Sequence, residues 1–214
     1  MARSARAQAL IEEFGGEDVR MGALKARARE IRTDHALALE LWASGRFHPR
    51  MLALLIMDKA ALDQIEIEAL AEDMTAHEAK RRDYLSDWLL ANQLMKTKRL
   101  SELIGGWADH ASPVLRRLFW YHQARLRWTG QAPPDNTEAL QEALEARMEG
   151  EHPMVQWAMN FCAGQIGVRQ SEHRERCVRL GERLGLYAEE KAPKNCTPNY
   201  LPDFIRIEAA KLEA

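Results

Sequence analysis

Apolar residues recur along the chain at spacings of three and four, whereas strict alternation of apolar and polar residues is almost absent. The first pattern is typical of amphipathic helices and the second of half-buried strands. The pattern therefore predicts helices over residues 2–14, 20–31, 34–44, 48–58, 63–72, 75–95, 98–109, 113–128, 137–149, 153–169, 171–184 and 202–212. A long irregular stretch is predicted at 186–201, before a short closing helix.

Short linkers rich in glycine, serine and proline separate most of these helices. Linkers of about two to seven residues make neighbouring helices lie antiparallel. A chain of 214 residues is long enough to bury one sizeable core. We therefore expect a single domain over residues 1–214.

A weak internal repeat supports this prediction. Pro49, Pro113 and Pro153 each fall in the first turn of a predicted helix, where the missing N–H of proline costs nothing. Their spacings are 64 and 40 residues, and the second is close to the period of HEAT-type helical pairs. The sequence thus predicts an all-α fold, an α-α superhelix of HEAT-like antiparallel helix pairs. A compact helical bundle is the alternative that the sequence leaves open.

Composition agrees with a helical protein outside membranes. Alanine and leucine together number nearly 60, against about 20 for valine, isoleucine and threonine. No apolar run approaches the roughly 18 residues of a membrane span, and no apolar segment follows the basic N-terminus as in a signal peptide. We expect a cytoplasmic protein.

The cysteines do not suggest disulfides or a metal. Cys162, Cys177 and Cys196 are too few and too scattered for a disulfide framework. His173 and Cys177 share a helical face, but no further ligand lies nearby in the sequence, and metal sites usually need three or four. We expect neither a metal nor another cofactor.

Charge is unevenly distributed along the chain. The formal net charge is −2, yet the segment from Lys80 to Arg127 has ten basic and four acidic residues. Such asymmetry permits an anion-binding face on an otherwise acidic protein. A solvated helix surface is the alternative explanation.

Three helices combine aromatic and polar residues on one face. Trp88 and Asn92 are four residues apart in the first. In the second, Arg117, Tyr121, Ala124 and Trp128 fall along one stripe. In the third, Trp157 and Phe161 lie at the edge of an apolar stripe. Aromatic residues at helical spacing are usually part of a core, so each one taken alone is also explained by packing.

These segments resemble the DNA alkylation repair family of HEAT-like-repeat DNA glycosylases. The similarity runs from about residue 20 to residue 184, and it is carried by Glu40-Leu41-Trp42, Leu52-Ala53-Leu54-Leu55-Ile56-Met57, the Trp88 helix, Pro113-Val114-Leu115-Arg116-Arg117 and Val155-Gln156-Trp157-Ala158-Met159-Asn160-Phe161. The resemblance implies a positively charged concave groove that holds duplex DNA. It also implies a cluster of two aromatic residues, a carboxylate and an arginine that removes N3- or N7-alkylated purines.

The resemblance assigns the cluster to four residues. Trp88 corresponds to the first aromatic residue and Arg117 to the arginine. Phe161 takes the second aromatic position, where the family has tryptophan, and Asn92 takes the position of the carboxylate. Asparagine cannot supply the negative charge that opposes a developing oxocarbenium ion, and losing one such group typically costs about 10²–10³ in rate. Basic residues expected to contact DNA phosphates are Lys96, Lys98, Arg99, Arg116 and Arg125.

Three functions follow as hypotheses. The first is a glycosylase that excises N3- or N7-alkylated purines from duplex DNA. The second is a catalytically silent relative that binds bent, branched or damaged DNA, and Asn92 motivates it. The third is a scaffold for a protein partner, as helical-repeat surfaces often are. We expect a monomer.

Overall fold

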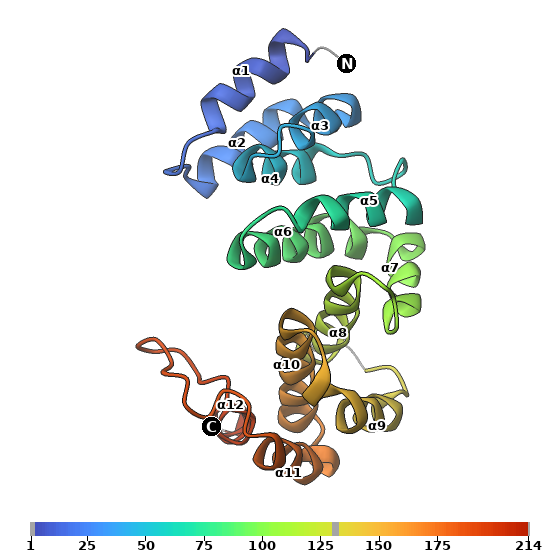
Figure 1. Cartoon of the computed structure of the whole chain (residues 1–214), viewed down its shortest axis with the longest axis vertical. Coiled ribbons are helices and arrows are strands. Elements are labelled where there is room, and N and C mark those ends of the chain that lie inside the picture. Colours follow the sequence, from blue (N-terminus) through green and yellow to red (C-terminus); the bar gives the residue numbers. More distant parts are fainter. Residues whose placement is uncertain (1–2, 130–132, 214) are drawn as a thin grey trace. The chain divides into compact units, whose positions relative to one another are not determined.

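The computed structural model describes residues 3–129 and 133–213, and every regular element within these ranges is helical. The α-helices are α1 (Ala5–Phe14), α2 (Met21–Ile31), α3 (His35–Trp42), α4 (Phe47–Ile56), α5 (Gln64–Met74), α6 (Ala79–Asn92), α7 (Lys98–Ile104), α8 (Pro113–Trp128), α9 (Thr137–Arg147), α10 (Pro153–Arg169), α11 (Arg174–Leu184) and α12 (Leu201–Glu213) (Figure 1). Single 3₁₀ turns follow or precede some of them: η1 (Leu94–Lys96), η2 (Gly105–Trp107), η3 (Met148–Gly150) and η4 (Ser171–His173). The predicted all-α class is confirmed.

The chain divides into two compact units, Met1–Leu115 and Arg116–Ala214. Helix α8 begins in unit 1 and continues into unit 2. The expectation of one domain over residues 1–214 concerns how the two units associate, and it stays a prediction.

Unit 1 is organised around α4, which contacts α2, α3 and α6. Met51, Leu52 and Leu54 of α4 are fully buried, so this helix forms the centre of the core. A four-residue linker joins α3 to α4 and makes them an antiparallel pair, and Figure 1 shows the two side by side. Gly45 in this linker has a φ of +71°, which glycine adopts at little cost.

A buried arginine determines where α5 ends. Arg50 of α4 donates from Nη1 to the carbonyl of Asp73 at 2.6 Å and approaches His77 Nε2 at 3.0 Å. This contact satisfies a carbonyl in the last turn of α5 and holds the turn that follows it. The predicted helix over 75–95 accordingly begins only at Ala79, because Glu78 has an extended backbone with ψ near 150°.

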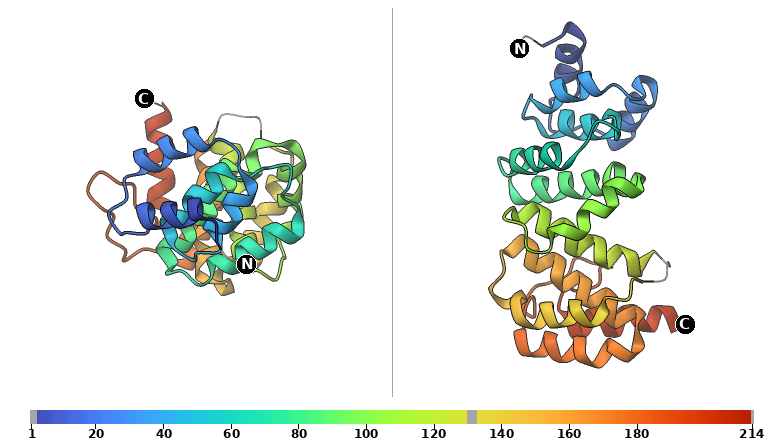
Figure 2. Two further views of the ribbon diagram at one scale, coloured as in Figure 1. Left: turned by 90° about the horizontal axis from the view of Figure 1, so that it is seen from above. Right: turned by 90° about the vertical axis from the view of Figure 1, so that its right-hand side faces the viewer.

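Unit 2 is organised around α10, which contacts α9, α11 and α12. In the right-hand view of Figure 2 the red α12 lies against the orange α10 and α11. Glycines permit this approach: a Cβ on Gly164 would lie 2.7 Å from Phe204, and one on Gly167 would lie 2.6 Å from Ile205. In the described ranges, none of the helices combines the length and apolar character that a membrane span requires.

Candidate nucleic-acid interface

Trp88 and Asn92 lie one turn apart on α6 in unit 1, and both are half-buried. The Tyr84 ring lies one turn before Trp88, with 5.9 Å between the ring centroids. Lys25 of α2 places its Nζ 5.8 Å from the centroid of the Trp88 ring. Trp88 is therefore a partly exposed aromatic surface with a cation beside it.

The Asn92 side chain is bound to its own helix. Its Nδ2 donates to the carbonyl of Trp88 at 3.0 Å. The amide therefore has a fixed orientation, and its oxygen is the remaining acceptor. A neutral amide in this position offers hydrogen bonding but no negative charge.

Arg117 and Phe161 belong to unit 2, where α8 and α10 bring together a larger cluster. The Arg117 guanidinium carbon lies 5.4 Å from the centroid of the Tyr121 ring and 5.4 Å from that of Trp157. Trp157 stacks on Phe161 with 5.6 Å between centroids and an interplanar angle of 8°. Tyr121 lies 5.6 Å from Phe161. Arg117 is thus held against two aromatic faces, which is a strong arrangement for a guanidinium.

Three members of this cluster were absent from the predicted site. The helical spacing already placed Tyr121 on the same stripe as Arg117 and Trp157 beside Phe161, but the resemblance assigned neither residue to the site. Phe204 of α12 contributes a ring 6.0 Å from Phe161. It comes from the far side of the irregular segment, so no local pattern places it there.

A buried polar side chain, Asn160, lies beside the cluster in the sequence. Asn160 precedes Phe161, is buried, and donates from Nδ2 to the carbonyl of Asn199 at 2.8 Å. Its Oδ1 has no hydrogen-bond partner among the described residues. Burial and then the nearby Arg125 lower the pKa of His122, which follows Tyr121 in α8.

The predicted phosphate contacts in unit 1 differ in character. Lys96 and Lys98 are exposed, and Lys98 lies 3.7 Å from Glu102 in a pair that is open to solvent. Arg99 instead donates to the carbonyls of Lys59 at 2.9 Å and Leu62 at 2.7 Å. Arg99 therefore stabilises the linker between α4 and α5, whereas the two lysines remain accessible to an anion.

The predicted contacts in unit 2 are more enclosed. Arg116 binds both carboxylate oxygens of Glu151, at 3.2 and 2.9 Å, and both side chains are 18% exposed. Arg125 is half-buried, with its guanidinium carbon 5.7 Å from the Trp128 ring. Much of the positive charge between Lys80 and Arg127 is therefore engaged within the fold.

Metal ligands do not gather in the described ranges: no group of three or more histidine, cysteine or acidic side chains could hold an ion there. His173 instead approaches Glu138 at 3.4 Å. Burial raises the pKa of Cys177 to about 11, so its thiol is protonated and unreactive.

Comparisons with known proteins give these clusters a context. Residues 5–194 match the model of a family described as DNA alkylation repair enzyme. A solved structure from "a new family of proteins related to the HEAT-like repeat DNA glycosylases with affinity for branched DNA structures" is similar to this chain with a TM-score of 0.70. The two share 17% sequence identity, and the match covers 97% of this chain and 89% of that one. None of the curated proteins matches this sequence.

The paired helices and the structural similarity define an all-helical protein with a HEAT-like repeat fold. Because the family model covers most of its length, the chain belongs to the DNA alkylation repair enzyme family. The resemblance seen in the sequence is confirmed. The roles of Trp88, Asn92, Arg117 and Phe161, and their meeting in one site, stay predictions, since the first two belong to unit 1 and the others to unit 2.

Proposed function

We propose that this protein binds distorted or branched duplex DNA through the phosphate backbone, without excising a base. Membership of the DNA alkylation repair enzyme family supports DNA as the partner. The affinity for branched DNA that is described for the family of the similar structure supports the preference for distortion. Exposed Lys96 and Lys98 provide charge for phosphates.

The proposal depends on one observation: Asn92, a residue without charge, takes the position that the resemblance assigns to a carboxylate. Excision of an alkylpurine builds positive charge on the sugar, and a nearby carboxylate stabilises that charge. Asn92 has no charge, and its amide donates to the Trp88 carbonyl of the same helix. The position therefore retains the shape of an aspartate without its electrostatic effect.

Binding and excision can be measured on the same DNA. Fluorescence anisotropy with a labelled duplex and a labelled four-way junction should show binding at low salt, with the junction bound more tightly. Methylated duplex DNA incubated with the protein should release N3- and N7-methylpurine only at the spontaneous rate. Faster release would contradict the absence of catalysis, and no binding to either DNA at low salt would contradict the whole proposal.

Excision of alkylated purines is the second candidate function, and the Arg117 cluster favours it. Its rings from Tyr121, Trp157 and Phe161 are half-buried, so part of each remains exposed. Aromatic faces attract a cationic base by about 0.5–2 kcal/mol per contact. This arrangement suits a cationic alkylpurine better than a neutral base.

Restoring the missing charge separates the two candidates. Asn92→Asp should raise the release of N7-methylpurine above the spontaneous rate, by as much as about 10²–10³-fold if the rest of the site is intact. The matched control is Asn92→Ala, which removes the amide and adds no charge. An increase with aspartate alone would show that the scaffold is a glycosylase site lacking its carboxylate. Equal rates for both variants would exclude Asn92 as the carboxylate position.

A further inference from the structure

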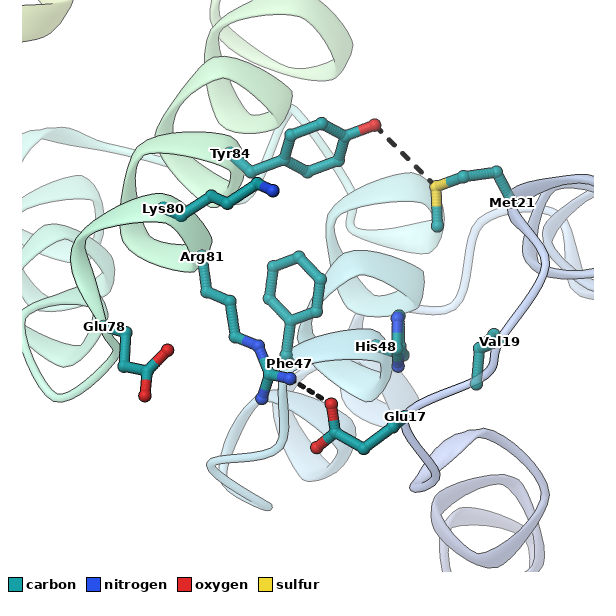
Figure 3. Close-up of a pocket in the computed structure, with 9 residues that line it drawn as sticks. All are labelled: Glu17, Val19, Met21, Phe47, His48, Glu78, Lys80, Arg81 and Tyr84. Atoms are coloured by element: carbon teal, nitrogen blue, oxygen red, sulfur yellow. Dashed lines mark hydrogen bonds and ion pairs between the residues drawn. The ribbon is translucent and has the colours of Figure 1, made fainter.

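A cavity of about 500 Å³ opens in unit 1, at the start of α4 and of α6 (Figure 3). Its volume lies within the range of small-molecule sites. The walls come from the α1–α2 linker, the first residues of α2 and the first turns of α4 and α6: Glu17, Val19, Met21, Phe47, His48, Glu78, Lys80, Arg81 and Tyr84. His48 donates from Nδ1 to the carbonyl of Gly16 at 2.9 Å, which attaches the linker to α4 and gives this wall a defined position. None of the residues predicted for the site or for DNA contacts lines this cavity.

Aromatic rings form a row that begins in the cavity. Phe47 and Tyr84 have ring centroids 6.1 Å apart, and Tyr84 and Trp88 have centroids 5.9 Å apart. Figure 3 shows the Phe47 and Tyr84 rings both projecting into the cavity. Tyr84 is 44% exposed, so part of its surface is available to a flat ligand.

Positive charge follows the same row. Lys25 lies beside Trp88, and the Arg81 guanidinium carbon lies 5.5 Å from the Phe47 ring. Arg81 also pairs with Glu17, so its charge is partly compensated. Lys80 is exposed, and no carboxylate among the described residues lies within ion-pair distance of it. Two lysines therefore remain for an anionic ligand.

Successive aromatic rings beside cations match the chemistry of single-stranded nucleic acid. An unpaired base exposes both faces and can stack on a side-chain ring, and its phosphate then lies within reach of a lysine. Bases inside a duplex have both faces covered by their neighbours and cannot use such rings. The row therefore distinguishes an unpaired strand from a duplex.

We propose that Phe47, Tyr84 and Lys80 form a binding site for one or two unpaired nucleotides, such as those at a strand end, flap or junction. Tyr84 supplies the stacking face, Phe47 closes the inner end of the site, and Lys80 binds phosphate. The proposal rests on the proposed DNA binding for the adjoining duplex, and its residues all belong to unit 1, whereas the cluster around Arg117 belongs to unit 2.

The test compares two labelled DNAs at the same salt concentration: a blunt duplex, and the same duplex with a three-nucleotide overhang carrying 2-aminopurine. We expect the overhang to bind about tenfold more tightly than the blunt duplex, as one stacked base allows. We also expect 2-aminopurine fluorescence to fall on binding, because stacking quenches it. Equal affinities for the two DNAs, with no quenching, would overturn the proposal.

Variants of the residues that line the cavity test whether the overhang preference and the quenching arise there. Tyr84→Ala should abolish the preference for the overhang and the quenching, whereas Tyr84→Phe should retain both, since it keeps the ring. Lys80→Ala should weaken binding of the overhang by several-fold, and the matched control Lys191→Ala, which removes an exposed lysine of unit 2, should not. Tyr84 is partly exposed and outside the core, so we expect the fold to tolerate its loss.

The same measurements separate failure of this site from failure of the proposed function. Binding of the blunt duplex that is unchanged in Tyr84→Ala, together with loss of the overhang preference, supports the site. An overhang preference that survives Tyr84→Ala would overturn it even if duplex binding is confirmed. Free dAMP that binds as tightly as the overhang would overturn the assignment to a strand and indicate a mononucleotide site.

Discussion

At the residue scale, Arg50 shows how one side chain connects several elements of unit 1. It is 6% exposed, and it donates from Nε to the Trp42 carbonyl at 3.1 Å and from Nη1 to the Asp73 carbonyl. Its guanidinium also lies 4.9 Å from the Trp42 ring, and Asp73 in turn accepts a hydrogen bond from Trp42 Nε1 at 2.8 Å. Arg50 therefore joins α3, α4 and the end of α5.

Removing this guanidinium should destabilise unit 1. Arg50→Ala leaves two backbone carbonyls without their charged donor, and each such hydrogen bond contributes about 1.5–3 kcal/mol. For the two bonds together we expect a loss of about 3–6 kcal/mol in the free energy of unfolding, measured by chemical denaturation. Arg29→Ala, which removes an exposed arginine from α2, is the control and should change little. Similar stabilities for the two variants would show that the network contributes nothing.

Two histidines should make stability depend on pH. Burial and then the neighbouring Arg50 and Arg81 lower the pKa of His77, and burial with Arg125 lowers that of His122. The unfolded chain therefore binds more protons than the folded one below the ordinary histidine pKa of about 6.5. Stability should be complete above that value and fall as the pH decreases through the window below it.

The melting temperature between pH 8 and pH 5 checks this sign. His77→Gln keeps an acceptor for Arg50 and cannot be protonated, so it should reduce the decrease. A decrease of the same size in the variant, or a melting temperature that rises toward pH 5, would exclude His77 as a source of the pH dependence.

The residues of the candidate site were only partly predictable. Trp88 and Asn92 share a face of α6, and Arg117 with Tyr121 share one of α8, because a period of four residues places side chains together. The contacts of Phe204 with Phe161 and of Tyr84 with Phe47 could not be predicted, because each joins helices that are distant in the sequence. The roles of Arg99 and Arg116 were also hidden, since their partners lie some 35 residues away or more.

At the scale of helices, apolar periodicity and capping residues account for most boundaries. Asp63 and Glu66 form a reciprocal capping box at the start of α5, and Ser4 caps α1. Pro113 and Pro153 each begin a helix, as predicted, while α4 begins two residues before Pro49. The predicted start of α6 at residue 75 was wrong. Arg50 holds the turn at 75–78, and this tertiary contact leaves no trace in the periodicity of the sequence.

Glycines in α10 determine how closely α12 can pack. A Cβ at Gly167 would lie 2.6 Å from Ile205 Cδ1 and 3.2 Å from the Cβ of Cys177. Gly167→Ala should therefore displace α12 and cost about 1–3 kcal/mol, as overpacking typically does. Limited proteolysis should cleave the 185–200 segment faster in this variant.

The matched control is Gly22→Ala in α2, where an added Cβ meets nothing within 4 Å. Alanine is the better helix former, so this variant should be at least as stable as the natural chain. If Gly167→Ala proved as stable as Gly22→Ala, α12 would have room to adjust and the close packing would not limit it.

At the scale of the whole molecule, the basic stretch from Lys80 to Arg127 predicts an anion-binding surface. The contacts of its side chains show which of these charges remain accessible to an anion. Arg127 is 2% exposed and donates to Gln170, Asn136 and Thr137, so its charge is structural. Arg99 and Arg116 bind partners within the protein. A count of charges in the sequence cannot separate these side chains from Lys96 and Lys98, because pairing depends on the fold.

This division predicts different effects on the salt dependence of DNA binding. Each lysine that contacts a phosphate releases counterions, and its removal should reduce the slope of log K against log salt by about 0.9. Lys96→Ala with Lys98→Ala should therefore reduce the slope by nearly two and leave the melting temperature unchanged. Arg116→Ala leaves Glu151 without its bidentate partner, so it should lower the melting temperature and change the slope little. Anisotropy titrations between 50 and about 200 mM salt measure the slope over the range in which such contacts dominate. If instead Arg116→Ala reduced the slope and the lysine variant did not, the accessible charge would lie on the arginine, and its pair with Glu151 would have to open when DNA binds.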